Sequence, residues 1–184
     1  MKKSLKIKIQ KIKNHKYRPK DFIIADAKDG DLAMGITTPG PIRNSKGEIS
    51  KGYKKLNDYK KSMMAMTKSK LVDIMLMSAS VGESLIQKKL FKDSSVTPAI
   101  RMNDTSDIWL MRNGNYRATN PRPFRSARIE AVNKLVNLGL FSVTFSKNVD
   151  FDLAMLNAYR DFRIEAVKYR FDHFLEIFNP PIDI

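Results

Sequence analysis

The chain of 184 residues contains no cysteine. Disulfide bonds and metal sites built on thiolates are therefore excluded, and the composition fits a reducing compartment. No stretch holds the roughly 18 consecutive apolar residues of a membrane-spanning helix. The basic first residues also lack the apolar segment and the cleavage site of a secretory signal. We expect a cytoplasmic protein that has no membrane among its partners.

Motifs for nucleic acids, nucleotides and metals are missing as well. The sequence contains no zinc-finger, helix-turn-helix or RNA-recognition pattern. It contains neither G-x-G-x-x-G nor G-x-x-x-x-G-K-[ST], the two common phosphate-binding fingerprints. His15 and His173 stand apart, and no spacing of His, Asp and Glu signals a metal site. We expect no nucleic acid among the partners, no metal and no cofactor.

Positive charges exceed negative charges by 15, and most of the excess lies at one end of the chain. Residues 1–20 contain nine lysines and arginines and no acidic residue, whereas the remainder contains 25 basic and 19 acidic residues. Alternation of Leu5, Ile7 and Ile9 with lysines predicts a half-buried strand in this basic N-terminal arm. A solvated basic strand and a surface that attracts phosphate groups are both compatible with this composition.

Apolar residues make up 42% of the chain, enough for one globular domain with a core over residues 21–184. Short, continuously apolar segments are typical of strands that are buried on both faces. Five such segments are present: 22–26 (FIIAD), 72–77 (VDIMLM), 96–102 (VTPAIRM), 141–146 (FSVTFS) and 173–178 (HFLEIF).

Helical patterns separate these segments. Apolar stripes predict helices over 57–71 and 150–170, and an S-x-x-E capping box predicts a helix that starts at Ser80. A further helix is predicted from Ser126 to a stop at Gly139. Segments 35–52 and 103–125 are rich in Gly, Pro and Asn and are predicted to be long loops.

Alternation of strands and helices predicts an α/β fold with a parallel sheet, either an open doubly wound sheet or a (β/α)8 barrel. The missing nucleotide fingerprints remove the main argument for the open sheet. A barrel needs eight strands and about 250 residues. We therefore expect a partial (β/α)8 TIM barrel of about five parallel strands and four helices, with its C-terminal strands missing. A truncated or split reading frame would explain this, and so would a homo-oligomer or partner chains that supply strands.

Polar side chains stand at the end of each apolar segment. The carboxyl ends of the strands of a barrel meet at one opening, so these side chains are candidates for a common site. They are Asp26, Lys28 and Asp29; Ser78 and Ser80; Arg101, Asn103 and Asp104; Ser146 and Lys147; and Glu176 and Asn179.

Two carboxylates are candidates for catalysis, and each has a structural alternative. Asp26 is suited to general acid or base chemistry if it is desolvated, or it pairs with Lys28 or Arg101. Glu176 lies inside an apolar segment, so it is either a site residue or the ion-pair partner of the same cations.

The remaining candidates would bind substrate or form a covalent intermediate. Asn103 and Asp104 would orient hydroxyl groups, although Asp104 is equally suited to cap a turn. Lys147 would form a Schiff base if desolvated, and otherwise lies in solvent. Arg122 and Arg125 precede a predicted helix and would seat a phosphate group, or else are solvated loop residues.

Several segments resemble bacterial proteins related to class I aldolases, the superfamily of deoxyribose-phosphate aldolase and the barrel-type fructose-bisphosphate aldolases. The segments are PKDFIIADAKDGD, LVDIMLMSAS, IRMNDTSDIW, NPRPFRSA, LGLFSVTFS and HFLEIFNP, and the likeness spans about residues 17–180. The resemblance implies a barrel that cleaves or joins carbon–carbon bonds in carbohydrate metabolism through a lysine Schiff base, without a metal.

Site residues carry over only in part. The first-strand aspartate of the superfamily falls on Asp26 or Asp29. Its Schiff-base lysine usually lies on the sixth strand, which would come after residue 184, whereas transaldolase-like relatives carry it on the fourth strand, near Lys147. The resemblance thus implies an aldolase-like lyase, incomplete as this chain, that acts on a small, phosphorylated carbonyl compound. The alternatives are a non-catalytic partial barrel that binds a partner as a scaffold, and a phosphosugar isomerase with paired carboxylates.

Overall fold

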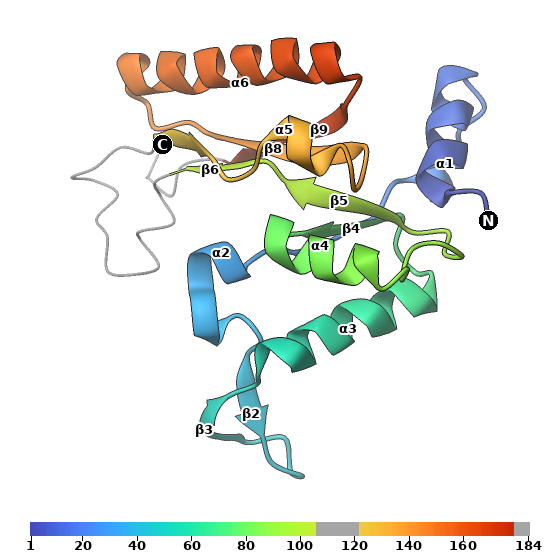
Figure 1. Ribbon diagram of the computed structural model, residues 1–184, viewed down its shortest axis with the longest axis vertical. Coiled ribbons are helices and arrows are strands. Elements are labelled where there is room, and N and C mark those ends of the chain that lie inside the picture. The colour runs from blue at the N-terminus through green and yellow to red at the C-terminus, as the bar shows by residue number, and fades with distance from the viewer. Residues whose placement is uncertain (106–121, 179–184) are drawn as a thin grey trace. The chain divides into compact units, whose positions relative to one another are not determined.

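The structure is a computed structural model that describes residues 1–105 and 122–178 (Figure 1). The chain divides into two compact units, Met1–Pro98 and Ala99–Ile184. Each unit combines helices with parallel strands, so the predicted α/β class is confirmed. Strand β5 (Thr97–Arg101) crosses the boundary between the units.

The first unit contains the parallel pair β1 (Ala25–Lys28) and β4 (Ile74–Met77), in register from Ala25 with Ile74 to Lys28 with Met77. All four residues of β4 are buried, as its continuous apolar run predicts. Helices α3 (Leu56–Ser69) and α4 (Ala79–Gln87) precede and follow β4 in the chain. The short elements of this unit are η1 (Pro19–Asp21), α2 (Asp31–Met34) and η2 (Gly35–Thr37).

Helix α3 forms because its apolar residues recur at helical spacing. Tyr59, Met63 and Thr67 are four residues apart and are all buried, which confirms the helix predicted over 57–71. The helix ends at Ser69, and its C-cap Lys70 adopts a left-handed conformation with φ of 58°. Helix α4 begins at Ala79, one residue before the predicted start, and Ser78 is its N-cap.

The basic arm is a helix, α1 (Ser4–Lys13), so the predicted strand is wrong. Leu5, Ile9 and Ile12 also match a helical repeat, and only Leu5 among the residues of α1 is buried. Lysines hold the helix to its unit. The Lys3 ammonium donates to the carbonyl oxygens of residues 91, 94 and 96 at 2.7–2.9 Å, and Lys8 pairs with buried Asp73 at 2.6 Å. Part of the basic excess therefore serves docking within the chain.

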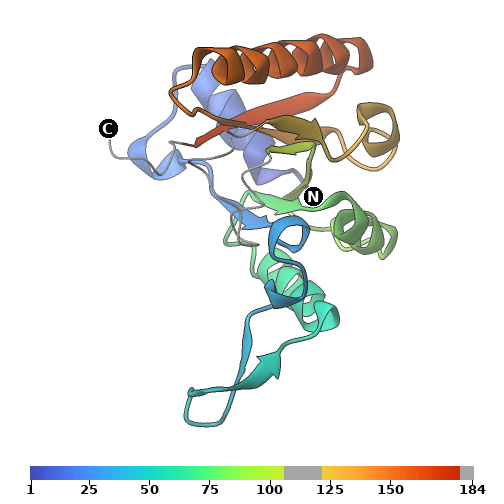
Figure 2. The same ribbon diagram turned by 90° about the vertical axis from the view of Figure 1, so that its left-hand side faces the viewer.

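Two further predictions in the first unit need correction. The first apolar segment does not form a strand from Phe22, because Phe22 is 63% exposed and β1 starts at Ala25. Segment 35–52 is not an open loop. It contains a hairpin of β2 (Pro41–Arg43) and β3 (Ile49–Tyr53), which Figure 2 shows projecting from the part of the unit formed by α2 and α3. Glycines at positive φ, Gly47 among them, allow its turns.

The second unit contains parallel strands in the order β5, β8 (Leu138–Thr144), β9 (Asp172–Phe178). The predicted strands over 96–102 and 173–178 are thus confirmed, and the strand predicted over 141–146 lies at 138–144. The predicted burial on both faces is wrong for β9, most of whose residues are exposed or only partly buried. Helix α6 (Val149–Tyr169) covers one face of β8, where Phe141 and Phe162 are fully buried with ring centroids 4.8 Å apart. A short hairpin, β6 (Asn103–Thr105) with β7 (Pro123–Arg125), lies within the predicted second loop, of which residues 106–121 fall outside the description.

The helix predicted over 126–139 is largely absent. Helix α5 covers only Ile129–Val132, and Gly139 is the second residue of β8. A Cβ atom built on Gly139 would lie 2.5 Å from Cγ of Met102 and 2.6 Å from Cε1 of Phe171. This glycine therefore permits close packing inside a strand and does not stop a helix.

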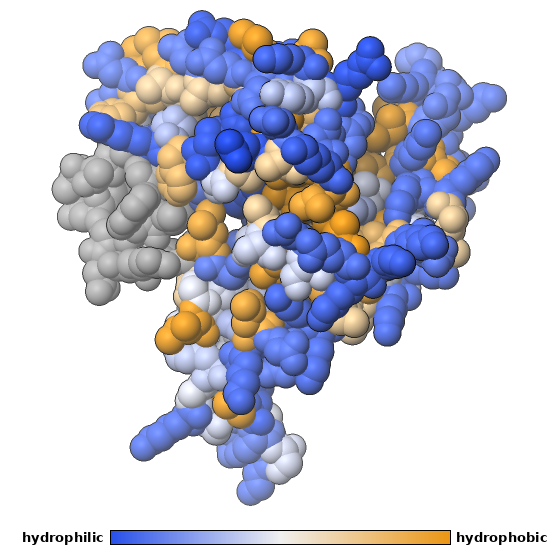
Figure 3. All heavy atoms as spheres, in the orientation of Figure 1, coloured by the Kyte–Doolittle hydropathy of each residue, from blue (hydrophilic) through white to orange (hydrophobic). Residues whose placement is uncertain are grey.

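The surface of α6 is mixed. Its exposed apolar side chains interrupt a hydrophilic surface, which Figure 3 shows as orange patches among blue along this helix. These side chains are Val149, Leu153, Leu156, Ile164 and Val167. Among the described residues, no helix combines the length and the apolar character needed to cross a membrane.

Candidate functional site

The candidate site of the first unit starts from an ion pair on β1. Asp26 and Lys28 are two residues apart on a strand, so their side chains lie on the same face. The Nζ atom of Lys28 lies 3.1 Å from Oδ1 of Asp26, and the two side chains are 29% and 15% exposed. The other carboxylate oxygen of Asp26 is buried and has no hydrogen-bond partner among the described residues. The structural alternative for Asp26, pairing with Lys28, is therefore observed.

Further polar groups gather just beyond β1. The Ser78 hydroxyl donates to Oδ2 of Asp31 at 2.7 Å, which ties the end of β4 to the start of α2. Asp29 is buried. Tyr59 of α3 faces the same carboxylates: burial, and then the charges of Asp31, Asp29 and Asp26, raise the pKa of its phenol to about 12. Two strand ends and one helix thus place a protonated phenol beside several carboxylates.

The raised pKa of Tyr59 can be tested by alkaline titration. We expect one tyrosine of the native chain to ionise near pH 12, and Tyr59→Phe to remove this step from the absorbance of tyrosinate. The pKa of Tyr59 in the folded state lies above the unfolded value of about 10. The contribution of the protonated phenol to the free energy of unfolding is therefore complete below pH 10 and is lost as the pH rises toward 12. Tyr17→Phe, at a residue 63% exposed, should leave the late step in place. A late step that survives Tyr59→Phe would contradict the assignment.

The candidate site of the second unit is a network on three parallel strands. Arg101 ends β5, Ser142 lies within β8, and Glu176 lies opposite Ser142 on β9. The guanidinium donates to the Ser142 hydroxyl at 2.8 Å and to Oε2 of Glu176 at 3.3 Å, and the hydroxyl donates to the same carboxylate oxygen at 3.0 Å. The proposed pairing of Glu176 with Arg101 is therefore present.

Two neighbours fix this network in position. The side chain of Asn103 exchanges two hydrogen bonds with the backbone of Ser142: its amide donates to the carbonyl at 2.9 Å, and its oxygen accepts from the N–H at 2.7 Å. Asn103 is completely buried, and Asp104 lies 3.8 Å from the guanidinium of Arg101. Arg101 itself is 12% exposed and Glu176 34%, so the carboxylate is the more accessible end of the network.

The other predicted site residues that the structure describes are Lys147, Arg122 and Arg125. Lys147 is exposed in the turn between β8 and α6, with φ of 60°. Arg125 pairs with Glu165 at 2.8 Å and stacks over the ring of Phe162, while Arg122 lies over the ring of Phe151. The helix that follows them has only four residues. Asn179 lies outside the described residues.

Sequence reasoning missed Tyr59, Asp31 and Ser142 as site residues. A serine inside the apolar segment FSVTFS is a usable signal, because a buried hydroxyl requires a partner. Tyr59 matched the apolar stripe of a helix, and nothing local marked its hydroxyl. Within residues 1–105 and 122–178, no cluster of three or more His, Asp or Glu side chains is suited to hold a metal ion.

Each of the two clusters contains a small set of groups that can take part in proton transfer or hydrogen bonding. The first holds a lysine with a carboxylate in hydrogen-bond reach, beside a phenol that stays protonated at neutral pH. The second presents a carboxylate that is fixed by an arginine and a serine. Such groups accept protons, donate hydrogen bonds to oxygen atoms and bind hydroxyl or carbonyl groups.

Comparison of the chain with protein-family models, curated proteins and solved structures finds no match.

Proposed function

We propose that the chain is an aldolase-like protein, built as part of a (β/α)8 barrel, that binds a small, phosphorylated carbonyl compound and makes or breaks a carbon–carbon bond through a lysine Schiff base. The observation that supports the proposal most directly is the placement of polar groups. In both units they stand at or near the carboxyl ends of parallel strands, of which β4 and β8 are fully buried. This is where α/β enzymes carry their chemistry.

Among the described lysines, Lys28 is the one best placed to form the Schiff base. It ends β1, is partly desolvated, and has the Asp26 carboxylate within hydrogen-bond reach as a proton acceptor. Asp26 would take one proton from the side chain of Lys28 before the amine attacks. The free amine then adds to the carbonyl carbon to give a carbinolamine. Asp26 then returns its proton to the carbinolamine hydroxyl, which leaves as water, and the product is the protonated imine.

The second cluster belongs to the other unit and is suited by itself to bind hydroxyl groups. Glu176, fixed by Arg101 and Ser142, would accept hydrogen bonds from such groups, and the carboxamide of Asn103 holds the strand that carries Ser142. Lys147 is exposed and has no carboxylate described within ion-pair distance, so this geometry favours Lys28 over Lys147 as the nucleophile.

Borohydride trapping tests the proposal on the full chain. We expect incubation with glyceraldehyde 3-phosphate and borohydride to add one reduced adduct, and peptide mapping to place it on Lys28 at least tenfold above any other lysine. Lys28→Arg should abolish this adduct and keep the charge, whereas Lys147→Arg should have no effect. Unphosphorylated glyceraldehyde should label less, because the proposed substrate carries a phosphate group.

Two results would overturn the assignment of Lys28. One is labelling spread evenly over surface lysines, and the other is an adduct that persists in Lys28→Arg. A third outcome would favour the non-catalytic alternative. The hydrogen bonds that Arg101, Ser142 and Glu176 form with one another also favour that alternative, because they give these side chains partners without a substrate. In that case the phosphorylated aldehyde would bind reversibly, with amide shifts around Ser142, and no adduct would form.

A further inference from the structure

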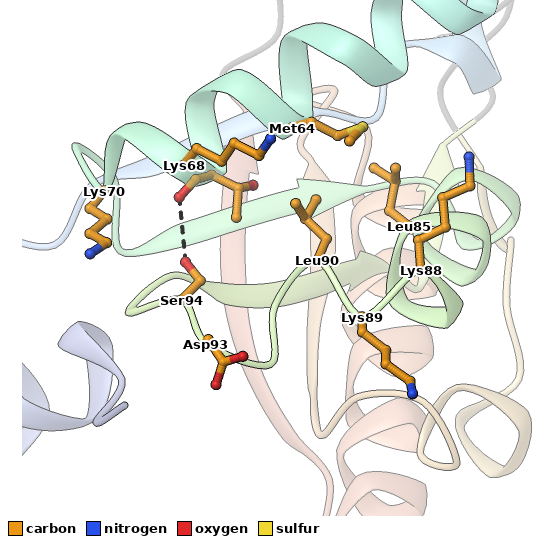
Figure 4. Close-up of a pocket in the computed structure, with 10 residues that line it drawn as sticks. Met64, Lys68, Lys70, Leu85, Lys88, Lys89, Leu90, Asp93 and Ser94 are labelled. Atoms are coloured by element: carbon orange, nitrogen blue, oxygen red, sulfur yellow. Dashed lines mark hydrogen bonds between the residues drawn. The ribbon is translucent and has the colours of Figure 1, made fainter.

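A separate cavity of about 420 Å³ lies in the first unit, between α3 and the segment after α4 (Figure 4). It is bordered by the C-terminal half of α3, by Leu85 near the end of α4, and by the turn that leads to β5. These segments precede β4 and β5, whereas Lys28 is the last residue of β1 and Ser78 follows β4. The cavity therefore lies at the amino ends of the strands, away from the candidate catalytic groups, and its function does not depend on theirs.

The lining combines an apolar floor with a basic rim. Met64, Leu85 and Leu90 supply the apolar surface, and Figure 4 shows them between α3 and the turn after α4. Four lysines, Lys68, Lys70, Lys88 and Lys89, and one acidic residue, Asp93, complete the lining with Thr67 and Ser94. None of the four lysines forms an ion pair with another described residue.

Cations near helix C-termini are favoured by the helix dipole, which accounts for some of these lysines. It does not account for two further features. Lys70 and Lys89 both adopt left-handed backbone conformations, with φ of 58° and 59°. Glycine adopts this conformation at a lower conformational energy than lysine does. Thr67 is 1% exposed, and its hydroxyl is buried without a hydrogen-bond partner among the described residues. An unsatisfied hydroxyl in the wall of a cavity is costly unless a ligand or water meets it.

We propose that this cavity binds a small amphipathic anion, with an apolar portion on Met64, Leu85 and Leu90 and an anionic group held by the lysines. The volume lies within the usual range of small-molecule sites. Surface lysines alone attract any anion weakly, whereas the apolar floor selects anions that carry an apolar portion. The Thr67 hydroxyl supplies a hydrogen bond inside the cavity.

Titration of the isotope-labelled full chain with hexyl phosphate, followed by amide NMR, tests this site. We expect saturable shifts confined to residues 64–70 and 85–94. Inorganic phosphate lacks the apolar chain and hexan-1-ol lacks the anionic group, so each should bind at least tenfold more weakly than hexyl phosphate. Hexylammonium, which carries a positive charge, should produce no shifts in these segments. Hexyl phosphate that shifts no amide in these two segments would overturn the proposal.

Variants separate a built site from general attraction to positive charge. Lys70→Gly with Lys89→Gly removes two cations at positions where glycine suits the backbone, so the fold should be kept while affinity for hexyl phosphate falls at least fivefold. Lys51→Gln with Lys54→Gln removes the same charge from exposed positions on and beside β3 and should leave affinity unchanged. Thr67→Val should weaken binding two- to fivefold without loss of the fold. Equal loss in both double variants would mean non-specific electrostatics and would overturn the site.

Discussion

Gly139→Ala is expected to destabilise the chain by about 3 kcal/mol or more, one of the largest effects of a single methyl group in this protein. The new Cβ would lie 2.5 Å from Met102 and 2.6 Å from the ring of Phe171, distances that real Cβ atoms do not show. Met102 is completely buried and Phe171 nearly so, so neither side chain can move without repacking its surroundings. Urea unfolding followed by circular dichroism measures the change.

Gly30→Ala is the matched control for this experiment. A Cβ on Gly30 would meet Thr38 at 3.6 Å and Met34 at 3.9 Å, which are ordinary contacts, and the backbone is already helical with φ of −65°. We expect its unfolding free energy to change by less than about 1 kcal/mol. Equal effects of the two substitutions would contradict the close packing described at Gly139.

Arg101→Met is expected to cost about 3 kcal/mol of folding free energy. The guanidinium is 12% exposed and contacts Ser142, Glu176 and Asp104, so its loss leaves two carboxylates and a hydroxyl without their cation. Arg160→Met is the control, because Arg160 and Asp161 are both 66% exposed and such pairs contribute little. Urea unfolding of both variants gives the comparison.

A double-mutant cycle isolates the pairing of Arg101 with Glu176. The double variant Arg101→Met with Glu176→Gln should lose less stability than the sum of the two single losses. Each single change leaves one charge of the pair without its partner, whereas the double variant removes both charges. Strict additivity would mean that the two side chains do not interact in solution.

Strands and long helices could be predicted because their signals are local. The apolar segment at 72–77 contains the fully buried strand β4, and the stripe of Tyr59 and Met63 marks a buried helix face. Such patterns depend on which residues must leave water, and that is a property of the side chains themselves. The polar groups that end these strands were found for the same reason.

Failures occurred where the deciding contact was distant. The alternation in the basic arm suggested a strand, but Lys3 and Lys8 hold a helix to groups more than 60 residues away. Gly139 has the appearance of a helix stop, yet it serves the packing of Met102 and Phe171. Glycine and alternating lysine are compatible with more than one local structure, so tertiary contacts decide between them.

The amino-acid sequence by itself determined the α/β class, the positions of most strands and the polar character of their carboxyl ends, because burial preference is carried by each residue. Only the tertiary structure decided which polar groups meet. Arg101 and Glu176 both reach Ser142 from positions 41 and 34 residues away, and the phenol of Tyr59 lies among carboxylates from another part of the unit. Contacts of this kind depend on strand register and helix placement, which the whole chain sets together.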